Sequence, residues 1–260
     1  MMKKIKPFLF RIQQLNGLLL PIAVALIWET MSRQGDAYAY TFVPLTQIAH
    51  GFIDLTKSGE LLINLVATLK TTVIGLLIGG VAGLLVGGLM AISPTANKLI
   101  GPLYHTIRQV PLLGLIPLIA LWFGNGLLSK ILIVSLAAFY PIVLNTFEGM
   151  RGVEKKYIEV SSVLKFNRLQ LFIHVLLPAA MPSILTGVMH ALAFAWISTV
   201  GTELLFSTGP GLGGLMQVAQ EASRMDIVII AVASIGLTGL LMNTGLSRAS
   251  QYLLRWRSVR

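Results

Sequence analysis

The chain has 260 residues, a mean hydropathy of +0.79 and 12% charged residues, against roughly a quarter in an average soluble domain. We therefore expect an all-α membrane protein that crosses the bilayer several times. The net charge of +10 does not indicate a nucleic-acid partner, because the Lys and Arg residues are not gathered on one soluble face. The absence of cysteine excludes disulfides, and the four histidines lack the spacing of metal ligands, so no metal site is predicted.

Six apolar stretches approach the length of membrane-spanning helices, about 20 residues each. They cover residues 15–31, 71–92, 99–123, 130–147, 174–206 and 227–246. Basic residues mark the cytoplasmic side: four precede the first stretch, five lie in the loop 148–170 and four follow the last stretch, while the opposite side has four in all. The sequence therefore predicts a single transmembrane domain, residues 1–260, with about six spans and both termini in the cytoplasm.

The N-terminal segment has a second interpretation. Basic residues before an apolar stretch also occur in cleaved signal peptides, and Ala37-Tyr38-Ala39 resembles a cleavage pattern. Because the stretch 15–31 is already close to a full span and further spans follow, we expect it to be retained.

Glycines recur at every fourth position of the second stretch, at Gly75, Gly79, Gly83 and Gly87. Small residues at this spacing let the backbone of another helix approach closely. We therefore expect a packing face here, with a glycine-lined permeation path as the weaker alternative.

The third stretch contains Pro102, Pro111 and Pro117, and between them Arg108 and Gln109. Proline removes backbone hydrogen bonds, and irregular backbone in a membrane is tolerated inside protein or beside a cavity. Two interpretations of Arg108 stay open: a charge inside the span that faces an anionic ligand or a carboxylate, or a residue at the membrane interface.

The loop that follows residue 147 has helical periodicity. Tyr157, Val160, Val163 and Leu164 fall on one face of the predicted helix, with charged and polar residues opposite. Such a helix either lies on lipid or docks in the groove of a partner protein.

The chain has no phosphate-binding motif and no catalytic motif, so we expect it not to be an enzyme. The glycine-rich run Gly209–Gly214 lacks the lysine of such a motif and is predicted to be a turn or a helix end. Glu203 interrupts the fifth stretch, either as a carboxylate of the kind that a proton- or cation-coupled carrier needs or as an interfacial residue. Trp196, Thr199 and Glu203 join Arg108 and Gln109 as candidate residues of a translocation pathway.

Several short motifs resemble those of the permease subunits of binding-protein-dependent ABC importers, in the nitrate, sulfonate and taurine group. They are Arg108-Gln109-Val110-Pro111, Ile116-Pro117-Leu118, Leu121-Trp122-Phe123-Gly124, Ser129-Lys130, Tyr140-Pro141-Ile142 and Asn145-Thr146. The resemblance implies a type I importer fold in a bacterial inner membrane and a small, anionic solute. It also implies three protein partners: a dimer of cytosolic ATPases that holds ATP and Mg, a second permease copy, and an extracytoplasmic binding protein.

The loop 148–170 also resembles the family's coupling motif, in which a short helix docks on the ATPase. The resemblance implies this role for Glu159, Val160, Ser161, Ser162, Lys165 and Asn167. Lys165 stands where the motif has the glycine of a left-handed turn, and a side chain there costs roughly 1–2 kcal/mol. We therefore hypothesise that the turn moves to Asn167, which tolerates the left-handed conformation and caps a helix that begins at Arg168.

Two other functions remain as alternatives. A secondary carrier would use Glu203 and Arg108 and need no ATPase, and a membrane scaffold would transport nothing. Co-purification with an ATP-hydrolysing subunit distinguishes the importer from the carrier.

Overall fold

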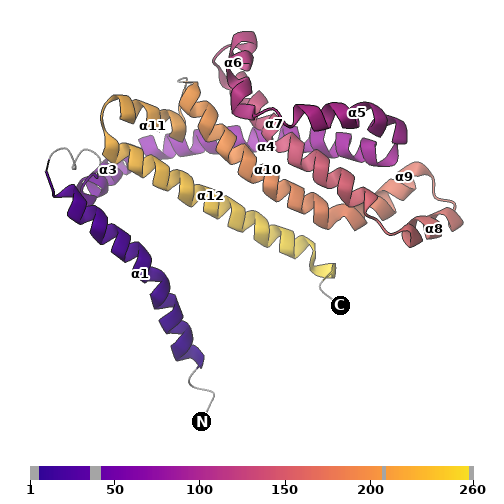
Figure 1. Ribbon diagram of the computed structural model, residues 1–260, viewed down its shortest axis with the longest axis horizontal. Coiled ribbons are helices and arrows are strands. Elements are labelled where there is room, and N and C mark those ends of the chain that lie inside the picture. The colour runs from indigo at the N-terminus through magenta and orange to yellow at the C-terminus, as the bar shows by residue number, and fades with distance from the viewer. Residues whose placement is uncertain (1–5, 36–41, 207–208, 258–260) are drawn as a thin grey trace.

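A computed structural model of the chain describes residues 6–35, 42–206 and 209–257. Helices are the only regular elements among these residues, which confirms the predicted all-α class (Figure 1). In chain order they are α1 (Lys6–Ser32), α3 (Leu45–Lys57), α4 (Glu60–Ile92), α5 (Pro94–Ile107), α6 (Leu112–Phe123), α7 (Leu127–Arg151), α8 (Lys155–Val163), α9 (Arg168–Leu171), the π-helix η1 (Phe172–Leu176), α10 (Leu177–Leu205), α11 (Leu212–Glu221), α12 (Met225–Leu253) and the 3-10 helix η2 (Arg255–Arg257).

Four continuous helical stretches are long and apolar enough to cross a membrane within the described part of the chain. They are Glu60–Ile92, Leu127–Arg151, Arg168–Leu205 and Met225–Leu253. Helices α5 and α6 form a fifth span if they are taken together. The sixth stretch expected from the sequence, residues 15–31, lies within α1, whose side chains are described from Leu19 onward; the tripeptide Ala37-Tyr38-Ala39 lies outside the described residues.

The third apolar stretch is not one straight helix. It consists of α5 and α6, which meet at an angle of 98° across the short segment 108–111. Pro111 precedes α6 directly, and its ring cannot continue the hydrogen bonds of α5. The prediction of irregular backbone at the prolines is therefore confirmed, and α6 projects from the bundle as a result (Figure 1).

The core is built where α4, α7 and α10 pack together. The glycine stripe of α4 lies directly against α7: a methyl group at Gly79 would overlap the carbonyl of Ser135, and one at Gly87 would lie 2.7 Å from the carbonyl oxygen of Val143. Small residues of α10, Ala191 and Ala195, close the same cluster from the other side. The predicted packing role of the stripe is confirmed.

Two helices lie in segments that the sequence pattern marks only as polar loops. Helix α3 buries Gly51 and Leu55, and α11 buries Leu212, Leu215 and Ala219, which recur at helical spacing. Both are short amphipathic helices, so their mean hydropathy hides them from a search for spans. They lie at the end of the molecule opposite α8 and α9 (Figure 1).

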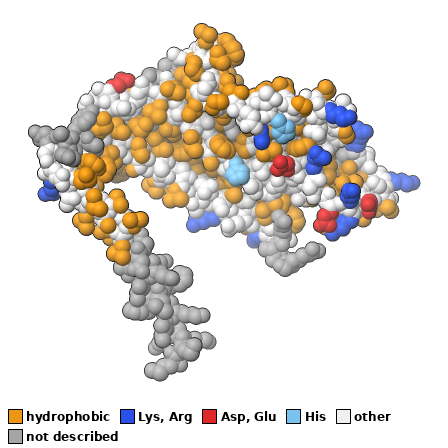
Figure 2. All heavy atoms as spheres, in the orientation of Figure 1, with side chains coloured by type: hydrophobic (Ala, Val, Ile, Leu, Met, Phe, Trp, Pro, Cys, Tyr) orange, Lys and Arg blue, Asp and Glu red, His pale blue; other side chains and the backbone are white. Residues whose placement is uncertain are grey.

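Charged side chains gather at one end of the molecule. Figure 2 shows most of the visible Lys and Arg residues at the end that carries α8 and α9, while apolar side chains cover much of the middle. This distribution places the loop 148–170 at the basic end of the helical body.

Candidate functional site

Helix α8 begins at Lys155 and ends at Val163, within the segment where a helix was expected. The Glu154 carboxylate accepts a hydrogen bond from Lys156 and raises the pKa of that ammonium group above its ordinary value. Apolar side chains of α8 stand in solvent rather than in the core: Val163 is 83% exposed and Val160 is 57% exposed. A helix of nine residues with so little burial is marginal alone.

The turn after α8 stays at Lys165, which contradicts the hypothesis that it moves to Asn167. Lys165 has φ = 56°, in the left-handed region. Its N–H donates to the carbonyl of Ser162, and the N–H of Phe166 donates to the carbonyl of Ser161, both at 3.0 Å. This pair of bonds defines the Schellman cap, whose left-handed position is usually a glycine. The cap satisfies two carbonyls of α8, and this gain holds Lys165 in a strained backbone conformation.

Asn167 has the capping role that was expected of it. It is extended, with φ = −74° and ψ = 171°, and it precedes α9 directly. Its side-chain oxygen accepts from the N–H of Gln170 at 2.8 Å, and the Gln170 side chain accepts from the N–H of Asn167 at 2.9 Å. This reciprocal capping box fixes the start of the helix that continues through η1 into α10.

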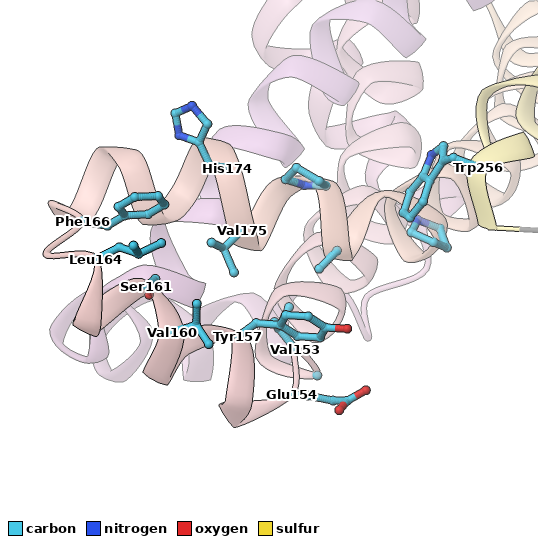
Figure 3. Close-up of a pocket in the computed structure, with 14 residues that line it drawn as sticks. Val153, Glu154, Tyr157, Val160, Ser161, Leu164, Phe166, His174, Val175 and Trp256 are labelled. Carbon is cyan, nitrogen blue, oxygen red and sulfur yellow. The ribbon is translucent and has the colours of Figure 1, made fainter.

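A groove of about 550 Å³ separates α8 from the start of α10. Tyr157, Val160 and Leu164 line one wall, and Val175 and Pro178 line the other. In Figure 3, Val160 and Tyr157 face Val175 across this groove, with Trp256 of η2 at its far end. The groove and the exposed face of α8 together form an apolar surface at the basic end of the molecule.

The remaining residues of the coupling motif differ in exposure. Glu159 and Ser162 are exposed, whereas Ser161 is 3% exposed and its hydroxyl donates to the carbonyl of Ile158 at 2.6 Å. Ser161 therefore packs against the body of the protein, and a direct part for it in docking stays a prediction.

Arg108 and Gln109 lie at the break between α5 and α6. They line a groove of about 450 Å³, which we call the hinge groove. The Arg108 guanidinium lies 5.8 Å from the centre of the Tyr104 ring. The other lining residues come from α5, the break, α6, α7 and α10: Tyr104, Val110, Pro111, Leu112, Ala137, Tyr140, Pro141, Leu144, Asn145, His190 and Phe194.

Glu203 is 1% exposed and takes part in a buried polar cluster. Its carboxylate accepts from the hydroxyl of Thr68 at 2.9 Å and from the N–H of Gly213 at 3.0 Å. Thr68 in turn accepts from the N–H of Leu212, and Asn64 accepts from the N–H of Gly211. Three successive N–H groups at the start of α11 are thus held by side chains of α4 and α10. Glu203 anchors the amino end of α11, where a negative charge is favourable.

The five candidate pathway residues fall into two separate groups. Arg108 and Gln109 line the hinge groove, and Trp196, Thr199 and Glu203 do not. Thr199 is fully buried, and its hydroxyl accepts a hydrogen bond from the hydroxyl of Thr72 at 2.9 Å. A pathway role for the second group stays a prediction.

Sequence reasoning missed the partners of both groups. Asn64, Thr68 and Thr72 recur at every fourth position of an apolar helix, a signal that would have marked the buried polar face. Tyr140 belongs to one of the motifs quoted above, but neither it nor His190 shows a periodic pattern that places it at the break after α5, because tertiary packing alone brings α7 and α10 there.

Comparisons with known proteins agree with this geometry. The model of the family described as binding-protein-dependent transport system inner membrane component matches residues 75–259. The putative aliphatic sulfonates transport permease protein SsuC of Bacillus subtilis is 35% identical, with 97% of this chain and 91% of the relative covered. The taurine transport system permease protein TauC of Escherichia coli is 34% identical, with 79% of this chain and 73% of the relative covered. Permeases named for nitrate and bicarbonate import match as well.

A solved structure of the MetNI methionine ABC transporter in an inward-facing conformation has a similar fold. Its TM-score is 0.59 at 20% identity, with 73% of this chain and 96% of the other covered. None of these comparisons supports the alternative of a secondary carrier. Membership of a binding-protein-dependent system implies an ATPase and a substrate-binding protein as partners. The chain belongs to the family of binding-protein-dependent transport system inner membrane components, the permease subunits of ABC importers.

Proposed function

We propose that the chain forms the membrane pathway of an ATP-driven importer for a small anion, and that α8 docks on the cytosolic ATPase of that importer. ATP and Mg belong to the ATPase, and the solute is delivered by an extracytoplasmic binding protein. The exposed apolar face of α8 beside its groove is the observation that carries the proposal.

A protein groove suits α8 better than a lipid surface does. Helices that lie in the membrane interface have a wide apolar face and a face rich in Lys and Arg. Helix α8 has only nine residues and carries Glu159 as well as Lys155 and Lys156, so its polar face has mixed charge. Exposed valines between such charges match the small contact face of a helix that inserts into a partner.

Val163→Asp tests the docking. The side chain of Val163 is 83% exposed, so the substitution leaves the fold unchanged, but it would place a charge in the contact with the ATPase. We expect co-purification of the ATPase to fall at least tenfold, measured on affinity-purified complex in detergent. Val218→Asp is the matched control, because Val218 is 64% exposed on α11 at the opposite end. Equal recovery of the ATPase with both variants would refute docking through α8.

A second copy of the chain completes the pathway in this proposal. Helix α6 projects from the bundle, and Leu121 and Trp122 are among its exposed apolar side chains (Figure 1). Arg108 and Gln109 at its base are polar groups that lipid tails cannot satisfy. A homodimer that pairs the α6 helices of two copies would shield these apolar side chains and the two polar groups from lipid. It would leave the apolar outer faces of α4 and α12 to the lipid.

The assembly belongs to the bacterial inner membrane in this proposal, with both termini in the cytoplasm. The family description names the inner membrane, and the two relatives SsuC of Bacillus subtilis and TauC of Escherichia coli come from bacteria. The basic end of the molecule, with α8, supplies the orientation.

The solute class follows from two relatives whose names refer to aliphatic sulfonates and taurine. The test uses the full importer in proteoliposomes, with ATP turnover as the readout. We expect the cognate binding protein loaded with taurine or an alkanesulfonate to stimulate turnover, and the unloaded protein to do so much less. If the binding protein loaded with either solute fails to stimulate ATP turnover, the proposed function is overturned.

A further inference from the structure

The hinge groove lies beside the middle of two core helices, α7 and α10. Pro111 begins the turn into α6, and Tyr140 and His190 lie near the middle of α7 and α10. The groove therefore lies at mid-height of the two helices that pack in the core, far from both ends of the spans. Its volume of about 450 Å³ falls within the range of small-molecule sites.

The groove carries a positive charge without a negative one. The half-buried Arg108 supplies a guanidinium group, and no Asp or Glu occurs among the described residues that line the groove. A lone guanidinium at this depth is costly against lipid tails and is retained where it faces a water-filled cavity or a ligand. The geometry of its five N–H donors suits the oxygens of a carboxylate, phosphate or sulfonate.

A second polar group in the groove lacks a partner. The hydroxyl of Tyr140 is buried, and among the residues that the structure describes none forms a hydrogen bond with it. The neighbouring Tyr104 hydroxyl is used differently, because it donates to the backbone oxygen of Tyr140 at 2.7 Å. Native proteins satisfy nearly all buried hydroxyls, so an unused one at the wall of the groove marks a donor that the protein itself leaves for another partner.

Apolar side chains form the rest of the groove. Val110, Leu112, Leu144 and Phe194 line it beside the polar groups. An inorganic anion would leave these surfaces in contact with water, whereas an aliphatic tail would cover them. The groove thus offers a polar corner for an anionic head and an apolar wall for a short carbon chain.

We propose that the hinge groove binds a small organic anion of the sulfonate type on its way through the membrane. The anionic head contacts Arg108 and Tyr140, and the tail packs against Phe194. This assignment rests on the proposed function as a permease, and it identifies where the pathway selects its solute.

Cysteine labelling in the assembled importer tests the charge and the access of the groove. The chain contains no cysteine, so Val110→Cys introduces a unique thiol in the groove, where Val110 is 41% exposed. We expect faster reaction with a sulfonatoethyl methanethiosulfonate than with its trimethylammonioethyl counterpart, and protection by free ethanesulfonate. Adding Arg108→Gln is expected to lower the ratio of the two rates about tenfold. Leu77→Cys, exposed on α4 outside every groove described above, is the control for access from lipid.

Uptake kinetics test the role of Tyr140. Tyr140→Phe removes a hydroxyl that forms no hydrogen bond with any described residue, so the fold is expected to keep its stability. We expect the KM for ethanesulfonate uptake to rise about fivefold, the equivalent of one lost hydrogen bond. Ser135→Ala is the matched control, because the Ser135 hydroxyl is also buried and unpaired on α7 but does not line the groove.

The outcomes separate this inference from the proposed function. The assignment would be overturned if Val110→Cys is not labelled. It would also be overturned if the two reagents label Val110→Cys at equal rates and adding Arg108→Gln leaves the ratio of these rates unchanged. An unchanged KM in Tyr140→Phe, in an importer whose binding protein stimulates ATP turnover, would also overturn it and leave the permease function intact. Failure of stimulation in the unmodified importer would count against the proposed function, and the labelling ratio would still decide whether the groove prefers anions.

Discussion

Lys165 illustrates how a single residue departs from a motif while the backbone keeps the motif's geometry. Its two flanking hydrogen bonds are those of a cap that normally uses glycine. Ser223 has φ = 59° and stands in the same position after α11, where the N–H of Arg224 donates to the carbonyl of Ala219. The chain thus ends two short helices with strained non-glycine residues, and the backbone bonds, not the side chain, select the conformation.

Lys165→Gly should relieve this strain. Removing the Cβ from a left-handed position favours the folded turn by about 1–2 kcal/mol, and the greater freedom of glycine in the unfolded chain offsets part of that. We expect two- to fivefold stronger protection of the amides of α8 in hydrogen exchange. Lys165→Ala keeps the Cβ and should give no gain. If the glycine variant exchanges as fast as the natural chain, the positive φ stores no appreciable strain.

The interpretation of Glu203 changes once its hydrogen-bond partners are known. Taken alone, a carboxylate in an apolar stretch fits either a coupled carrier or a residue at the membrane interface. In the structure its Oε2 atom accepts both from the hydroxyl of Thr68 and from the N–H of Gly213, which makes it the link between α4, α10 and the amino end of α11. A buried carboxylate with two donors serves to hold an element in place.

At the scale of the element, the glycine stripe of α4 decides how closely two spans pack. In lipid no hydrophobic driving force brings helices together, so the contact depends on van der Waals packing at short range. The stripe meets the backbone of α7 over several turns, so α4 and α7 pack closely along it.

Gly79→Ala is expected to separate these helices. The added methyl would overlap the carbonyl of Ser135, and overpacking of this kind costs about 1–3 kcal/mol. We expect a lower melting temperature of the purified chain in detergent. The measurement is the fraction of chain that stays monodisperse in size-exclusion chromatography after heating. Gly80→Ala is the control one residue away, where the new methyl would lie 3.4 Å from the side chain of Ile142. Equal melting temperatures for the two variants would show that the stripe is not a tight contact.

At the scale of the whole molecule, α4 sets the distance between the two ends. Its 33 residues make a rod of about 50 Å, longer than the roughly 30 Å of a bilayer core. Helices α3 and α11 lie at one end of this rod, and α8 and α9 lie at the other (Figure 1). The two ends must therefore face opposite sides of the membrane.

Labelling of intact cells checks the orientation of these ends. We expect a membrane-impermeant maleimide to react with Ser58→Cys, in the exposed turn between α3 and α4. It should not react with Lys156→Cys on α8, nor with a cysteine added after Arg260, until the membrane is permeabilised. Labelling of the added C-terminal cysteine in intact cells would contradict a cytoplasmic C-terminus.

The sequence by itself determined the class of the molecule, most of its helices and the position of α8, because hydropathy, proline and helical periodicity act over short stretches of chain. It also located the glycine stripe, since a fourfold spacing is visible without a partner helix. It failed where a residue's environment comes from distant segments. Thr68 and Glu203 are separated by 135 positions, and no local pattern joins them. Pro111 predicts a break after Arg108 but not its angle of 98°. The hinge groove and the strained turn at Lys165 were decided by tertiary packing and backbone hydrogen bonds, whose free energy outweighed local preference.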